Sequence, residues 1–135
     1  DPAKSRQVAD AMIAEGVDVI VGSLNLGMQG VFEAVKANTG SKVLVTAKYS
    51  DKSQFAPDNY IASLIYDFAG PLKAIVTKVK EGTTGGYYPL GFDTGVQIQS
   101  PLQNVPESVS TEMDAVIADL VSGKIQVVKD ITPIE

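Results

Sequence analysis

Apolar and polar positions alternate along this chain in blocks that predict helices and strands in turn. Short apolar runs rich in β-branched residues predict strands at residues 17–21, 43–46 and 61–65. Helical periodicity around these runs predicts four helices, which end at Gly16, residues 38–40, Gly82 and Gly123. This order is typical of an α/β fold in which helices connect the strands of a parallel sheet and lie on both of its faces.

The C-terminal half carries weaker strand signals. Residues 87–92 and 96–99 predict a small antiparallel hairpin joined at Asp93-Thr94-Gly95, and residues 125–128 are also strand-like. Asp93-Thr94-Gly95 matches the triplet of aspartic proteases, but such an enzyme needs two carboxylates that share a proton. The sequence has no second triplet. We therefore interpret these residues as a turn.

The first predicted element is a helix, whereas an α/β unit of this kind opens on a strand. We expect the strand at residues 17–21 to have an open edge, where another strand of a complete lobe would pair. We interpret residues 1–135 as a single lobe that is incomplete by itself.

Polar side chains gather where the predicted strands end. In parallel sheets these carboxyl ends meet at one edge and commonly bind ligands. The loop at residues 22–27 follows the first strand, a polar loop at residues 47–59 follows the second, and Tyr66 ends the third. The candidate ligand-binding residues are Ser23, Asn25, Gly27, Lys48, Tyr49, Asp51 and Tyr66.

Each candidate also has a purely structural interpretation. The loop at residues 22–27 is either an ordinary connection with a capping Ser or Asn, or a set of backbone amides that hold an anion. Asp51 either closes an Asx-type turn or accepts ligand hydrogens, and Tyr49 either faces solvent or stacks on a ring. Tyr66 is either a buried aromatic residue or a ligand contact.

Composition favours binding over catalysis. The chain has 11 basic and 16 acidic residues, for a net charge of −5, and its basic residues form no run, which argues against a nucleic-acid partner. It has no His and no Cys, which excludes a Ser-His-Asp triad and imidazole or thiolate metal ligands. We expect no catalytic residue, metal site or cofactor. A flavodoxin-like enzyme is the less favoured alternative.

Four segments in the same order resemble the basic membrane protein (BMP) family of substrate-binding lipoproteins. They are DPAKSRQVADAMIAEGVDVIVG, GMQGVFEAVKANTGSKVLV, YSDKSQFAPDNYIASLIYDFAG and PLQNVPESVSTEMDAVIADLVSGKI. The resemblance implies a type I periplasmic-binding fold, and the chain matches only the later part of the family. It also implies that the chain belongs to a ligand-binding lobe.

The resemblance implies a role in an ABC importer. The protein would be its extracytoplasmic component, periplasmic or anchored as a lipoprotein, and would bind a purine- or nucleoside-like molecule. Its partners would be a membrane permease and the remaining lobe, from the same protein or another chain. A ligand-sensing receptor domain of the same fold is the alternative.

Two positions depart from the family's pattern. Nucleoside-binding members carry an Asp and a Lys toward the ribose where this chain has Tyr49 and Tyr66, whereas Asp51 matches the family's second aspartate. Two aromatic rings suit a flatter ligand with fewer hydroxyl groups, such as the free purine bases that a related subgroup binds.

Overall fold

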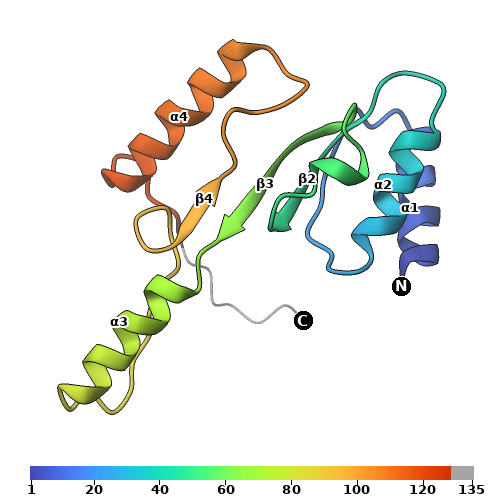
Figure 1. Ribbon diagram of the computed structural model, residues 1–135. Coiled ribbons are helices and arrows are strands. Elements are labelled where there is room, and N and C mark those ends of the chain that lie inside the picture. The colour runs from blue at the N-terminus through green and yellow to red at the C-terminus, as the bar shows by residue number, and fades with distance from the viewer. Residues whose placement is uncertain (129–135) are drawn as a thin grey trace.

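A four-stranded sheet in the order β1-β2-β3-β4 runs through the centre of the chain (Figure 1). The structure is a computed structural model and describes residues 1–128. Its elements are α1 (Pro2–Ala14), β1 (Val19–Val21), α2 (Met28–Ala37), β2 (Leu44–Tyr49), the 3-10 helix η1 (Ser53–Phe55), β3 (Tyr60–Tyr66), α3 (Ala69–Lys80), β4 (Val96–Ile98) and α4 (Glu107–Val121).

The pairing of the first three strands confirms the predicted α/β fold. β1 pairs with β2, and β2 with β3, in parallel. β1 is the terminal strand of the sheet, as expected, and the side chain of Val21 on this edge is 78% exposed. An edge of this kind offers unpaired backbone groups and apolar surface to another chain segment.

Short-range signals define the helix ends. The Asp1 carboxylate accepts hydrogen bonds from the amides of Ala3 (2.9 Å) and Lys4 (3.4 Å), and Pro2 occupies the first turn of α1. Asp67 accepts a 2.9 Å bond from the amide of Ala69 at the start of α3. Gly16, Gly82 and Gly123 have positive φ angles just after α1, α3 and α4. A residue with a Cβ rarely adopts that conformation, so glycine ends each helix there.

The predicted hairpin is wrong in its first strand. Residues 87–92 form no strand, and β4 pairs antiparallel with β3 instead. Pro89 lacks the N–H that a strand ladder needs, and Gly86 and Gly91 weaken the same segment. The predicted turn does form, since the amide of Thr94 donates to the carbonyl of Gly91 at 3.0 Å. The predicted strand at residues 125–128 is irregular as well.

The core lies between α1, α2 and one face of the sheet. Phe32 and Val35 of α2 pack with Val45 and Ala47 of β2, and all four are buried. On the other face, Thr46 and Lys48 line an apolar cavity of about 280 Å³ together with residues of α4. Helices therefore lie over both faces of the sheet.

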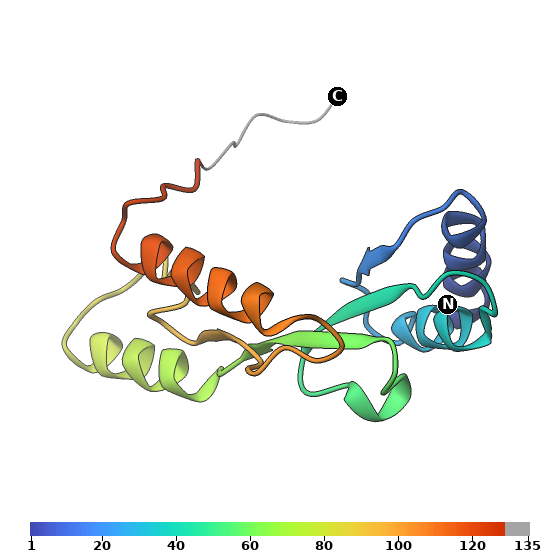
Figure 2. The ribbon, with the colours of Figure 1, turned by 90° about the horizontal axis from the view of Figure 1, so that it is seen from above.

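The two ends of the sheet differ in how fully they are covered. α3 and α4 lie at the end away from α1 and α2 (Figure 2). α3 carries an exposed apolar stripe, which comprises Leu72, Ile75, Val76 and Val79. Within residues 1–128, no helix is long and apolar enough to cross a membrane.

We predict that Gly30→Ala destabilises the protein. A Cβ at Gly30 would collide with the carbonyl oxygen of Pro2, where α1 crosses α2. In an unobstructed helix the same change stabilises by roughly 1 kcal/mol, whereas here overpacking should lower the free energy of unfolding by about 1–3 kcal/mol. Urea unfolding measures the change.

Gly85→Ala is the matched control, because a Cβ at Gly85 would meet no atom within 4 Å. If Gly30→Ala is as stable as Gly85→Ala, the close approach of the two helices is not a constraint on the fold.

Candidate functional site

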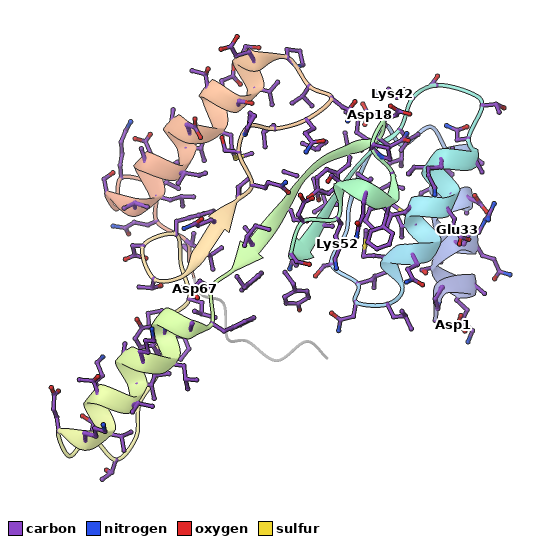
Figure 3. All side chains as sticks on the ribbon, in the orientation of Figure 1. Asp1, Asp18, Glu33, Lys42, Lys52 and Asp67 are labelled. Atoms are coloured by element: carbon purple, nitrogen blue, oxygen red, sulfur yellow. The ribbon has the colours of Figure 1, made fainter. Side chains whose placement is uncertain are left out.

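The parallel pairing brings the carboxyl ends of β1, β2 and β3 to one edge of the sheet. Figure 3 shows Lys52 at this edge, just after β2, and Asp18 at the opposite end, just before β1. Crevices at such strand ends are the usual ligand sites of open α/β sheets.

A cavity of about 300 Å³ opens between the β1–α2 loop, α2 and the end of β2. Three of the predicted residues, Asn25, Lys48 and Tyr49, line it together. Its wall combines amide, ammonium and aromatic groups with the apolar side chains of the loop. It is therefore able to bind a small molecule that has both a flat apolar surface and polar edges.

Several side chains that line this cavity were not predicted from the sequence. Gln29 lines it from the first turn of α2, and Lys52 and Phe55 line it from the loop after β2. Phe55 stacks on Phe32 with ring centroids 5.6 Å apart, and the Lys52 ammonium lies 5.9 Å from the Phe55 ring. The one signal available was the position of Lys52 and Phe55 inside the polar loop.

Tyr49, Tyr66 and Phe68 form an aromatic row across the ends of β2 and β3. The ring centroids of Tyr49 and Tyr66 are 5.2 Å apart, and those of Tyr66 and Phe68 are 5.7 Å apart. Tyr49 is 46% exposed and Phe68 57% exposed, so both outer rings present surface to solvent. Phe68 was not predicted, because it follows β3 by two positions and reads as part of a helix start.

The backbone of Tyr49 is held in an unusual conformation. Its φ angle is +79°, in a region that residues with a Cβ seldom adopt. Such strain persists only where surrounding contacts impose it, and it is commonest at functional sites. The residue with this backbone conformation is the one whose ring contacts Tyr66 at the point where β2 ends.

Asp51 has the geometry of an Asx-type turn. Its carboxylate accepts a 2.8 Å hydrogen bond from the amide of Ser53, the first residue of η1. This backbone bond, followed by the Ser53 hydroxyl, holds the pKa of the Asp51 carboxyl below its ordinary value. Asp51 is fully exposed and lies outside the wall of the 300 Å³ cavity. The structural interpretation of Asp51 is therefore confirmed, while its role toward a ligand stays a prediction.

The loop after β1 divides its residues between two cavities. Ser23 and Gly27 line a larger apolar cavity of about 790 Å³ beside α1 and the open edge of β1, and Asn25 lines both cavities. The Gly27 carbonyl accepts a 2.6 Å bond from the Ser5 hydroxyl of α1. The structure therefore does not bring Ser23 and Gly27 together with the aromatic row.

The amides at the start of α2 are already bonded within the chain. Those of Met28, Gln29 and Gly30 donate to the carbonyls of the preceding loop at 3.0, 3.2 and 3.1 Å. An anion at this helix start would have to break these bonds. These bonds favour the interpretation of residues 22–27 as an ordinary connection, and a role of the loop toward an anion stays a prediction.

Tyr60, Ser63 and Gln99 form a polar cluster behind the loop that carries Asp51. Tyr60 is 0% exposed, and burial raises the pKa of its hydroxyl, so this group stays protonated at neutral pH. Among the described residues, no group of three or more His, Cys, Asp and Glu side chains is placed to hold a metal ion.

Residues 1–130 match the family of PnrA-like ABC transporter substrate-binding proteins, Bmp. The chain belongs to this family. No protein with a curated description matches it in sequence.

Two solved structures share its fold. A solute-binding protein of an ABC transporter system from Aeropyrum pernix K1 is 19% identical, with a TM-score of 0.73 over 98% of this chain and 46% of that one. Another from Conexibacter woesei DSM 14684 is 17% identical, with a TM-score of 0.65 over 94% and 42%. The chain thus spans less than half the length of either protein.

We predict that the Asp51 carboxyl titrates below the ordinary range of exposed aspartates. The hydrogen bonds that lower this pKa stabilise the folded loop at pH values above the pKa of Asp51 in the unfolded chain. This stabilisation is lost as the pH falls through the pKa of Asp51 in the folded protein. Ser53→Ala removes the hydroxyl but keeps the amide, so the pKa should rise only part of the way. Carbon-detected NMR titration of the carboxyl measures both values, and an ordinary pKa in the unmodified protein would contradict the Asx-turn geometry.

Proposed function

We propose that this protein is the extracytoplasmic substrate-binding component of an ABC importer and that it binds a purine- or nucleoside-like small molecule. The observation that carries the ligand assignment is the aromatic row of Tyr49, Tyr66 and Phe68 beside the 300 Å³ cavity. Membership of the Bmp family supports the transport role.

The aromatic row favours a flat ring as the ligand. Aromatic rings stack on one another in offset or tilted arrangements with centroids 4.5–7 Å apart, and the row already uses this geometry. A purine adds one more ring to such a row. The neighbouring cavity then supplies groups for the polar edge of the base, from Asn25, Gln29 and Lys48.

Ligand release and capture would depend on the rest of the protein. The open edge of β1 suits a further strand of this lobe, and the stripe of exposed apolar residues on α3 suits contact with a remaining lobe, which would close over the ligand. Closure would shift the population toward a form that a membrane permease recognises. The binding step needs no bond to be made or broken.

Calorimetry of the full-length protein with hypoxanthine, inosine and ribose tests the proposal. We expect hypoxanthine and inosine to bind and ribose alone not to bind, because ribose offers no ring for the aromatic row. Tyr49→Ala should weaken hypoxanthine binding by about tenfold, the loss expected for one stacked pair. Asp51→Ala should also weaken binding.

Asp18→Ala is the matched control, because Asp18 lies at the opposite end of the sheet (Figure 3). Its affinity for hypoxanthine should equal that of the unmodified protein. Binding of ribose as tight as that of inosine would contradict the purine assignment, as would unchanged affinity in both Tyr49→Ala and Asp51→Ala.

A further inference from the structure

The polar cluster of Tyr60, Ser63 and Gln99 lies behind the loop between β2 and β3, residues 50–59, called the Asp51 loop below. Tyr60 and Ser63 of β3 are 0% and 1% exposed, and Gln99 follows directly after β4. Burying hydroxyl and amide groups is unfavourable unless they are hydrogen-bonded. A phenylalanine at position 60 would fill almost the same space without this requirement. Packing alone therefore does not account for the hydroxyl of Tyr60.

An irregularity in β3 creates this cluster. Val45 of β2 pairs with Tyr60 and Ala47 pairs with Ser63, so two steps along β2 correspond to three along β3. In a regular strand, residues three apart point to opposite faces. The extra residue turns Tyr60 and Ser63 toward each other, and their side-chain oxygens lie 2.7 Å apart. Bulges of this kind re-aim side chains and are frequent next to binding sites.

The hydroxyl of Tyr60 uses its full bonding capacity. Gln99 Oε1 lies 2.5 Å from it and has no proton to give, so the tyrosine proton is donated to Gln99. The Ser63 hydroxyl can then donate to the tyrosine oxygen at 2.7 Å. The amide of Lys52 donates to the same oxygen in a longer bond of 3.4 Å. One oxygen thus joins β3, the residue after β4, and the loop after β2.

The bond to Lys52 reaches the residue next to Asp51. The neighbouring amide of Ser53 is the one that holds the Asp51 carboxylate, at 2.8 Å. Two bonds to Ser63 hold Gln99 in place. The backbone amide of Gln99 donates to the Ser63 carbonyl at 2.9 Å, and the side-chain Oε1 of Gln99 accepts from the backbone amide of Ser63 at 3.4 Å. The position of the Asp51 loop is therefore linked to the pairing of β4 with β3.

We propose that Tyr60 and Gln99 are positioning residues that hold the Asp51 loop in its ligand-binding geometry, an inference that rests on the function proposed above. Tyr60 is fully buried and its hydroxyl is bonded to Gln99, so both side chains act through the loop rather than on the ligand. The segment after β4 thereby influences a much earlier part of the chain, the loop between β2 and β3, on the far side of β3.

Tyr60→Phe and Gln99→Met test the proposal in the full-length protein. Each keeps the volume of the side chain and removes a hydrogen bond that the cluster needs. Tyr88→Phe is the matched control, because it removes a tyrosine hydroxyl after α3, where the ring faces Lys78 at 5.5 Å. Two readouts are measured: hydrogen exchange at the amides of Lys52 and Ser53 without ligand, and calorimetric affinity for hypoxanthine.

We expect exchange at both amides to be about fivefold faster in Tyr60→Phe and Gln99→Met, as for the loss of one hydrogen bond. Hypoxanthine affinity should fall by a similar factor. In an Asp51→Ala background, Tyr60→Phe should cause no further loss of affinity, because its effect passes through Asp51. A residue that only stabilises the fold would lower the melting temperature without this dependence on Asp51.

Unchanged exchange at Lys52 and Ser53 in Tyr60→Phe would overturn the proposal. So would unchanged hypoxanthine affinity in Tyr60→Phe where Asp51→Ala is weakened, and in that case the proposed function would stand. If the unmodified protein binds neither hypoxanthine nor inosine, the proposed function fails together with the affinity claim. Faster exchange in both variants would then still establish that Tyr60 and Gln99 position the loop.

Discussion

The central constraint in this structure is the parallel pairing of β2 with both of its neighbours. Because β1, β2 and β3 run in the same direction, the loops and residues that follow them meet at one edge. This pairing brings Tyr49 against Tyr66 and sets the loop after β1 beside the loop after β2. The direction of the strands thus determines where the candidate site lies, and the side chains determine its chemistry.

The packing beneath the sheet sets how firmly that edge is held. α2 lies directly on β2 through Phe32 and Val35, and α1 approaches α2 closely enough that Gly30 has no room for a Cβ. Phe32 also stacks on Phe55 of η1, which ties the loop after β2 to the core. The cavity at the strand ends thus has one rigid wall on α2 and one wall on a loop.

The two walls of the cavity are stabilised by different interactions. The α2 wall depends on apolar packing, which is insensitive to direction. The loop wall combines the stack of Phe55 on Phe32 with the hydrogen bonds of Tyr60 and Asp51, which depend on the directions of donor and acceptor. The irregularity in β3 reaches the loop wall directly, through the bond from the Lys52 amide to the Tyr60 hydroxyl.

The local sequence determined most of the elements of this protein but not how its second half pairs. The glycines that end α1, α3 and α4 and the apolar strands depend on residues close together in the chain, and all were predicted. The pairing of β4 with β3, in place of the expected hairpin, depended on competition between distant segments.

The candidate site divides in the same way. The position of Tyr49, Lys48 and Asn25 at strand ends followed from the pattern of the chain, and they do line one cavity. The separation of Ser23 and Gly27 from the aromatic row, and the bond between Tyr60 and Gln99, were decided only by tertiary structure. Periodicity reports which way a side chain points within its own element, whereas these contacts depend on the register between strands, and one extra residue in β3 changes it.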